Sequence, residues 1–334
     1  MLLSFNDICL VPSVISDIEH RSECNPYLDN EMLPLFTAPM SSVINENNWQ
    51  IFKENKINTI IPRTVDFKTR CSLYMDTFIA VSLSEFEYLI ASSIPSSTMY
   101  ICIDIANGHM KKLLDLCKKA KSIFGNKIQI MAGNIANPDT YYEYAKAGID
   151  YVRCGIGTSP ICTTSANSGV HYPMVSLLQE INYIKKDILN GYKGKLENYK
   201  SIPKIVADGG FSNFDQIIKA LAIGADYVML GKIFAMSEEA CGEVMFNHNG
   251  ERIRKYYGMS TKKAQTEISG EATKTAEGIE TLVPIKYTLA GWCDNFISYL
   301  RSAMSYCNSR TLTEFKQNAY FEQISANSFQ AYYK

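Results

Sequence analysis

A single cysteine stands among small polar residues in the stretch GIGTSPICTTSANSG, which covers residues 155–169. Cys162 comes shortly after an apolar run, and Thr164 lies two positions further on. A thiol here could be a buried residue at the end of a strand, or it could be a nucleophile on a loop. Nucleophilic attack requires a thiolate on a segment that can reach the substrate and then withdraw. Cys154, inside the apolar run, is expected to be an inert core thiol.

Polar residues and glycines also follow several other apolar runs. Asp104 and Asn134 each lie near the end of one run, and Asp208 ends another and is followed by two glycines. Glycines let backbone N–H groups approach an anion closely, so we favour a phosphate site here, with tight turns as the simpler alternative. The residues at the ends of runs are Asp104, Asn134, Gly155, Gly157, Asp208, Gly209, Gly210 and Gly231.

The segments that must position these residues form a repeating pattern. Each apolar run is too short for a buried helix, and too continuously apolar for a strand with one solvent-exposed face. Continuous apolarity is typical of parallel strands covered on both sides, and helix-like segments separate most of the runs. The pattern predicts an α/β fold, a (β/α)8 TIM barrel, with its chemistry at the carboxyl ends of the strands. The expected strands are 35–40, 57–63, 78–83, 99–106, 127–134, 151–157, 204–210 and 227–232.

Two segments do not fit a plain barrel. Residues 185–201 are polar and rich in lysine, so we expect a surface excursion there. Residues 233–290 follow the eighth strand and contain NHNG (247–250), a good hairpin turn. A long, weakly structured polar tract follows from Ser260 to Thr275, and such a tract beside an active rim is commonly a lid. We interpret residues 258–280 as a flap, with disorder as the alternative.

Composition excludes several classes of protein. The 334 residues include 33 basic and 34 acidic side chains, so no basic field exists to bind nucleic acid. The hydrophobic fraction of 46% permits the large core of a single barrel domain over residues 1–334. No apolar run reaches the ~18 residues of a membrane-spanning helix, and no signal peptide is evident. Ten cysteines without a CxxC pair indicate reduced thiols in the cytoplasm and argue against a zinc site.

The motifs occur in an order that resembles the IMP dehydrogenase/GMP reductase family. Any one fragment would be a weak signal, but the ordered set is specific and extends from about residue 5 to about residue 315. The resemblance implies a (β/α)8 barrel that binds a purine nucleotide monophosphate, and a homotetramer. The motifs are FNDICLVPS, RSEC, TAPMSSV, IDIANG, IMAGN, GIGTSPICTT, ADGG, ADYVMLG, YYGMS and AEG.

The resemblance also implies roles for individual residues. Cys162 attacks purine C2 to form a covalent intermediate, while Thr164 and Glu277 relay a proton to the departing amine. Family members often bind a monovalent cation such as K+ through backbone carbonyls, here near Gly155, Gly157 and Cys162. The implied cofactor-binding residues are Asp104, Asn134 and Gly155, and the implied substrate-binding residues are Asp208, Gly209, Gly210, Gly231, Tyr257, Met259 and Ser260.

Three features favour the reductase branch, which converts GMP to IMP with NADPH, over the dehydrogenase branch, which oxidises IMP to XMP with NAD. Only 14 residues (64–77) separate the second and third expected strands, where typical dehydrogenases insert a regulatory (CBS) domain. The chain between Gly258 and Glu277 lacks the Arg-Tyr pair of the dehydrogenase flap. CTT followed by AEG is similar to the reductase's catalytic set. A short IMP dehydrogenase, a noncatalytic nucleotide-binding relative and a flavin-dependent oxidase are the alternatives.

The chain departs from the family's pattern in three places, one of which is His171-Tyr172, where small or glycine-rich residues are common. The other two bear on phosphate binding. The family usually has Pro-Gly-Ser or Ser-Gly-Ser where this chain has Thr158-Ser159-Pro160. The serine hydroxyl expected to contact phosphate is thereby replaced by Pro160, which has neither hydroxyl nor N–H. Lys232 follows Gly231, where the family usually has glycine or serine. A lysine there could supply charge to the phosphate in place of the lost serine, or it could point into solvent.

Overall fold

An eight-stranded parallel sheet forms the centre of the protein in the computed structural model, which describes residues 1–92, 96–159, 161–192, 198–259, 261–271, 275 and 278–332. The strand order is β2-β9-β8-β7-β6-β5-β4-β3. Phe36 bridges Asn58, and the Thr37 N–H donates to the Asn58 carbonyl at 2.9 Å, which closes the sheet between β2 and β3. The strands are β2 (Leu35–Thr37), β3 (Ile60–Ile61), β4 (Phe78–Val81), β5 (Met99–Ile103), β6 (Ile128–Ile135), β7 (Tyr151–Cys154), β8 (Lys204–Asp208) and β9 (Tyr227–Leu230).

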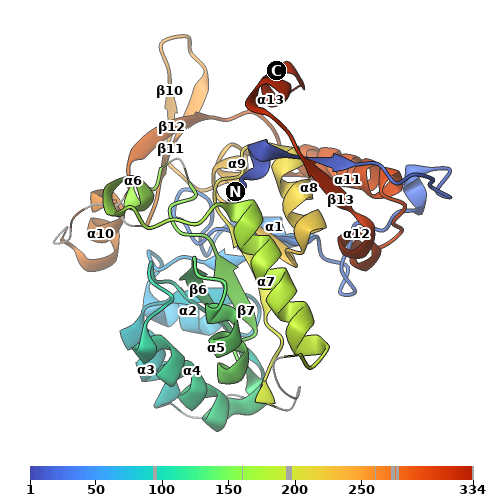
Figure 1. Ribbon diagram of the computed structural model, residues 1–334. Coiled ribbons are helices and arrows are strands. Elements are labelled where there is room, and N and C mark those ends of the chain that lie inside the picture. Colours follow the sequence, from blue (N-terminus) through green and yellow to red (C-terminus); the bar gives the residue numbers. More distant parts are fainter. Residues whose placement is uncertain are drawn as a thin grey trace.

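Helices surround this barrel (Figure 1). Each of the eight expected apolar runs contains one strand, so the predicted (β/α)8 TIM barrel is confirmed. Most of the strands end before their runs do, because the last residues of those runs bend into the loops of the rim. The surrounding helices are α1 (Trp49–Glu54), α2 (Phe67–Leu73), α3 (Leu83–Ile90), α4 (Lys111–Phe124), α5 (Thr140–Ala147), α7 (Met174–Leu189), α8 (Phe214–Ile223) and α11 (Leu289–Tyr306).

Aromatic rings pack inside the amino-terminal end of the barrel. The ring of Phe36 lies 4.9 Å from that of Tyr227, and the rings of Phe78 and Tyr151 meet edge to face at 5.3 Å. These rings come from four different strands and hold the barrel together through packed aromatic contacts. The opposite end, at which the strands finish, carries the loops and polar side chains.

A separate three-stranded antiparallel sheet, β10-β11-β12, follows β9 and α9 (Lys232–Ala235), and its β10–β11 hairpin projects from the barrel (Figure 1). β10 (Val244–Phe246) and β11 (Arg252–Tyr257) flank the predicted turn at 247–250, and β12 (Glu280–Pro284) pairs with β11. The expectation of weak structure from Ser260 to Thr275 is wrong in part, because α10 (Lys262–Ser269) forms there. Thr261 caps this helix by accepting the N–H of Ala264 at 3.3 Å.

The expectation of a surface excursion at 185–201 is also wrong for its first part. Helix α7 continues to Leu189, and Lys185 lies 2.7 Å from the carboxylate of Asp226 in an ion pair. The lysine-rich segment that is expected on the surface therefore includes a partly buried structural cation. Residues 193–197 lie outside the described part of the chain.

The Asp226 carboxylate makes the free energy of unfolding of the barrel depend on pH. Burial alone would raise the pKa of Asp226, but Lys316 and Lys185, each at 2.7 Å, outweigh it and lower the pKa to about 2. Because the folded value lies below the ordinary one, this stabilisation is complete above about pH 4 and is lost as the pH falls toward 2. Between pH 6 and pH 3 the wild type should lose about 1 kcal/mol more unfolding free energy than Asp226→Asn, and about 2 kcal/mol more by pH 2.

Urea denaturation at each pH measures this difference. Asp215→Asn is the matched control, because Asp215 also pairs with a lysine, Lys219 at 3.0 Å, but its own side chain is 27% exposed. Parallel acid profiles for the wild type and Asp226→Asn would contradict the assignment.

The two ends of the described chain are joined in a small sheet. β1 (Ile8–Val11) pairs antiparallel with β13 (Tyr320–Gln323), in the register Ile8 to Gln323. Helices α12 (Leu312–Asn318) and α13 (Ala326–Tyr332) flank β13. Among the described residues no helix has both the length and the apolarity to cross a membrane.

Candidate active site

The loop after β7 brings Cys162 to the carboxyl end of the barrel. Helix α6 (Thr164–Ser168) begins two residues beyond it, and the Cys162 thiol donates to the Thr164 hydroxyl at 3.2 Å. The Cys162 side chain is half-buried, whereas Cys154 is fully buried. Burial raises the pKa of the Cys154 thiol, which therefore stays protonated in the core. The two cysteines thus occupy the contrasting environments that the sequence predicts.

The flap reaches this loop through its backbone. The Ile279 N–H donates to the Ile161 carbonyl at 3.0 Å, and Gly278 and Cys162 form an antiparallel bridge. Glu277 directly precedes Gly278 in the sequence. Three of the predicted positions, Pro160, Ser260 and Glu277, lie outside the described residues.

Two cavities, each of about 190 Å3, meet at Cys162. A nucleophile in the wall between two cavities can bond to a molecule in one while a second molecule approaches through the other. The residues that line both cavities are Ser159, Cys162, Asp208 and Gly209. The first cavity is also lined by Gly210, Gly231, Lys232, Tyr256 and Gly258, among others, and the second by Asn134, Gly155, Gly157, Thr158 and Thr164, among others.

Three positions on the wall of the first cavity require glycine, two because of their backbone conformation and one because of a close neighbour. Gly209 and Gly210 have φ angles of 87° and 85°, in the left-handed region that other residues adopt only with strain. A side chain at Gly231 would begin 2.7 Å from the hydroxyl of Tyr256. These three glycines therefore leave backbone groups exposed on the cavity wall, as an anion site needs.

Tyr256 and Lys232 add polar groups to the same wall. The Tyr256 phenol is buried, and burial raises its pKa, so it stays protonated. Its hydroxyl donates to the Met40 sulfur at 3.8 Å. Lys232 is the one cationic residue among the described residues that line the first cavity. Tyr257 and Met259, which the family resemblance implies as substrate-binding residues, line neither cavity.

A buried arginine, which the sequence analysis did not select, organises the acidic residues of the rim. Arg153 lies 3.0 Å from Asp104 and 2.8 Å from Asp208, and each of the three side chains is at most 12% exposed. Burial opposes the charge of Arg153, but the two carboxylates raise its pKa and keep it cationic. The signal in the sequence was a single charged residue inside the apolar run YVRC.

Asn134 and Arg63 complete this network. The Asn134 amide donates to Asp208 Oδ2 at 2.7 Å and to the Gly155 carbonyl at 2.9 Å. Arg63, at the end of the second expected strand, donates to the backbone carbonyl of Asp104 at 3.3 Å. Asp104, Asn134 and Asp208, predicted from three different strands, are therefore brought together at one edge of the barrel.

The loop carbonyls have the chemistry that a monovalent cation requires. The Gly155 carbonyl accepts from Asn134, and the Gly157 carbonyl accepts from the Ser165 hydroxyl at 3.1 Å. A carbonyl oxygen has two lone pairs, so each keeps one for a hard cation. Among the described side chains no cluster of three or more metal-ligating residues occurs.

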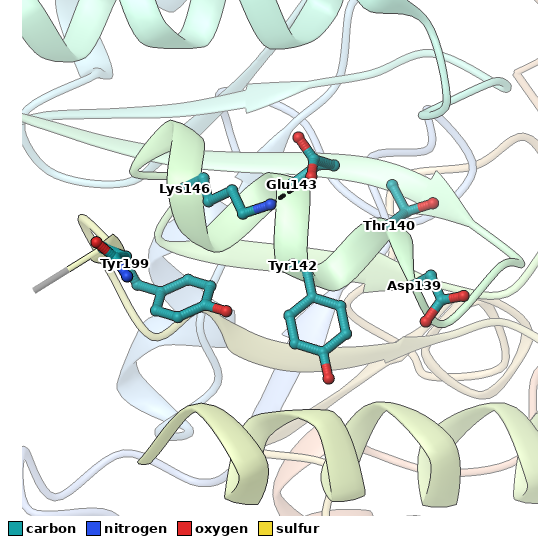
Figure 2. Close-up of a pocket in the computed structure, with 7 residues that line it drawn as sticks. Asp139, Thr140, Tyr142, Glu143, Lys146 and Tyr199 are labelled. Carbon is teal, nitrogen blue, oxygen red and sulfur yellow. Dashed lines mark hydrogen bonds and ion pairs between the residues drawn. The ribbon is translucent and has the colours of Figure 1, made fainter. Parts of the chain in front are cut away.

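An open depression of about 830 Å3 lies elsewhere, beside α5, and has different chemistry. Figure 2 shows Lys146 reaching toward Glu143, and the two form an ion pair at 2.8 Å. The Tyr142 and Tyr199 rings lie 6.4 Å apart on its wall. It contains neither a cysteine nor a glycine among its described lining residues, so we place the candidate active site at Cys162.

Comparison with known proteins agrees with this geometry. The IMP dehydrogenase / GMP reductase domain matches residues 82–331, which include the Cys162 loop, Asp208 and the flap. The chain belongs to this family. The family membership that the ordered motifs indicate is therefore confirmed.

Individual relatives cover different parts of the chain. A GMP reductase of Photobacterium profundum is 30% identical over 315 residues, which is 90% of this chain and 86% of the relative. An inosine-5'-monophosphate dehydrogenase of Chlorobaculum tepidum is 34% identical over 259 residues, which is 74% of this chain but 49% of the relative. A GMP reductase of Vibrio campbellii is 34% identical over 70% of this chain and 63% of the relative. The chain thus spans about half of the dehydrogenase and more of the reductases.

Proposed function

We propose that this protein is a purine nucleotide oxidoreductase, and that it is a GMP reductase, which converts GMP to IMP and ammonia with NADPH. The position of Cys162 carries the proposal, because its thiol lies beside the Thr164 hydroxyl in the wall shared by two cavities. One cavity can take the nucleotide and the other can admit the hydride donor. The names of the relatives support the same class of reaction.

In this proposal the first cavity binds the nucleotide. The glycine backbone and Lys232 face the phosphate, and Asp208 binds the ribose hydroxyls. The hydrogen bonds that Asp208 accepts from Arg153 and Asn134 all reach Oδ2, which leaves Oδ1 for the sugar among the described contacts. Ionised carboxylates have about four lone-pair sites, so one oxygen can be structural while the other binds substrate.

Cys162 then adds to C2 of the guanine ring and forms a carbon–sulfur bond. The Thr164 hydroxyl lies 3.2 Å from the sulfur, within reach of an amine on the carbon that the sulfur attacks. Ammonia leaves poorly unless it is protonated, so Thr164 and Glu277 are assigned to deliver that proton. NADPH, when bound, would supply the hydride that adds to C2. The carbon–sulfur bond then breaks, which releases IMP and restores the free Cys162 side chain.

The second cavity is the proposed entry for the nicotinamide end of NADPH. Asn134 and Gly155 line it and Asp104 lies nearby, joined to it through Arg153. The carbonyls of Gly155, Gly157 and Cys162 would hold a monovalent cation such as K+ and order the Cys162 loop. A homotetramer in the cytoplasm is part of the same proposal.

The connection between β3 and β4 supports the reductase over the dehydrogenase, because it holds the short helix α2 and no inserted domain. An absorbance assay at the nicotinamide band tests the choice directly. NADPH consumption with GMP, and no NADH production from IMP and NAD, is the expected result. The reverse result would show that the protein is a dehydrogenase. No change in absorbance in either assay, with nucleotide binding intact, would show that it is a noncatalytic relative.

Lys232 is expected to supply the phosphate contact that Pro160 cannot. Lys232→Ala should weaken GMP binding by about 1.5–3 kcal/mol, the range for hydrogen bonds to charged groups, and guanosine should bind both proteins equally. Isothermal titration with the nucleotide and the nucleoside measures both values. The control is Lys263→Ala, whose lysine does not line the first cavity. Equal GMP affinity in the wild type and Lys232→Ala would refute the contact.

A further inference from the structure

Three side chains join α10 to the barrel in a hydrogen-bonded group, the Glu267 cluster (Ser41, Tyr257 and Glu267). The Tyr257 hydroxyl donates to Glu267 Oε1 at 2.8 Å, and the Ser41 hydroxyl donates to Oε2 of the same carboxylate at 3.1 Å. The two hydroxyl oxygens are 3.2 Å apart. Ser41 follows β2, Tyr257 ends β11 and Glu267 belongs to α10, so the cluster ties the flap to two fixed elements.

Polar contacts decide whether α10 is docked, because the helix has little apolar surface. Its sequence is KKAQTEIS, and among its described side chains only Ala264 is fully buried. A helix of this length is not stable by itself, and burying one methyl group contributes little. Burial raises the pKa of Tyr257 to about 12, so its hydroxyl stays protonated and able to donate. The same ring lies 4.6 Å from the Lys263 ammonium.

The flap that contains the docked helix also contacts the loop that carries the candidate nucleophile. The chain leaves α10 at Ser269 and returns to the Cys162 loop at Gly278, where the backbone bridge to Cys162 forms. The Ile279 N–H closes the contact on the Ile161 carbonyl at 3.0 Å. Eight positions in the sequence (270–277) separate α10 from Gly278, so we expect undocking of α10 to weaken the contact of Gly278 and Ile279 with the Cys162 loop.

We propose that Glu267 is a positioning residue that holds the flap on the barrel through Ser41 and Tyr257 and thereby sets how often Cys162 is uncovered. This inference rests on the proposed function, in which Cys162 is the nucleophile. It assigns the Tyr257 hydroxyl to the flap rather than to the nucleotide.

Alkylation of Cys162 by iodoacetamide in the whole protein, without nucleotide or cofactor, tests the proposal. The rate is read by mass spectrometry on the peptide that contains Cys162, beside hydrogen exchange of the α10 amides. Glu267→Ala and Tyr257→Phe should each raise both rates by about two- to tenfold, the effect of losing an ordinary hydrogen bond, because Glu267 is exposed and solvent screens its charge. Glu267→Gln, which keeps an acceptor for Tyr257, should restore part of the protection.

Thr266→Ala is the matched control, since it alters an exposed residue of the same helix and should change neither rate. The buried Cys154 reports global unfolding and should stay unreactive in every variant. Under assay with GMP and NADPH, the Glu267 variants should lower kcat with little change in KM for GMP, because the cluster lies outside the first cavity.

Unchanged alkylation and exchange in both Glu267→Ala and Tyr257→Phe would overturn the positioning role. Equal increases at Cys162 and Cys154 would also overturn it, since they would report loss of the fold. A wild type without GMP-dependent NADPH oxidation would overturn the proposed function alone, because alkylation needs neither nucleotide nor cofactor.

Discussion

Replacing Cys162 with alanine is expected to abolish turnover while GMP binds within about tenfold of the wild type, or about 1.4 kcal/mol. The thiol acts in the chemical step, whereas the glycines, Lys232 and Asp208 line the cavity assigned to the nucleotide. Removing a group that acts only in chemistry lowers kcat and leaves ground-state binding nearly intact. NADPH oxidation with GMP measures the first effect, and equilibrium titration of GMP measures the second.

Cys154→Ala is the control for this variant. Its thiol is fully buried, lines neither cavity and is held protonated, so the variant should keep its activity. An alanine variant at position 162 that retains even a few per cent of the wild-type rate would show that another group forms the covalent bond.

Replacing Arg153 with methionine is expected to destabilise the protein by about 3–5 kcal/mol, the cost of removing one partner from a buried ion pair. Asp104 and Asp208 are each 12% exposed and lie on the two sides of this guanidinium. Without it, two poorly solvated carboxylates share one edge of the barrel with no cation between them. Chemical denaturation of the wild type and Arg153→Met measures the loss.

Arg310 offers a matched control, because it also bridges two carboxylates, Asp17 and Glu23, each at 3.1 Å. Its side chain is 42% exposed, so Arg310→Met should destabilise the protein far less than Arg153→Met does. Arg153→Lys keeps the charge but not the planar fork, and its stability should fall between those of the wild type and Arg153→Met. Equal losses in Arg153→Met and Arg310→Met would contradict the argument from burial.

The barrel could be predicted because its strands are buried on both faces and therefore read as unbroken apolar runs. Asp104, Asn134 and Asp208 were found by the same logic, since the ends of parallel strands share one rim. Arg153 was not found, because a charged residue inside a strand gives no hint of which side chains it meets across the barrel. Its partners come from β8 and from the end of β5, and only the folded barrel brings them together.

Tyr256 and Tyr257 show a second feature that could not be predicted from the sequence. Neighbouring residues on a strand point to opposite faces, and two tyrosines in a row give no indication of which one faces the cavity. The structure places Tyr256 on the cavity wall and Tyr257 beside Glu267. Helix α10 escaped prediction for a related reason: its KKAQTEIS sequence has no apolar stripe, so its position depends on hydrogen bonds that periodicity does not reveal.

The pairing of β1 with β13 constrains the order in which this protein can fold as it is synthesised. Residues 8–11 leave the ribosome early, but their partner strand at 320–323 is made more than three hundred residues later. β2 likewise cannot pair with β9 until the residues from Val228 onward have been synthesised. Until then both early strands carry unpaired backbone edges and uncovered apolar side chains, which favour association between chains. The growing chain, rather than the finished barrel, is therefore the form of this protein most exposed to aggregation and most in need of chaperones.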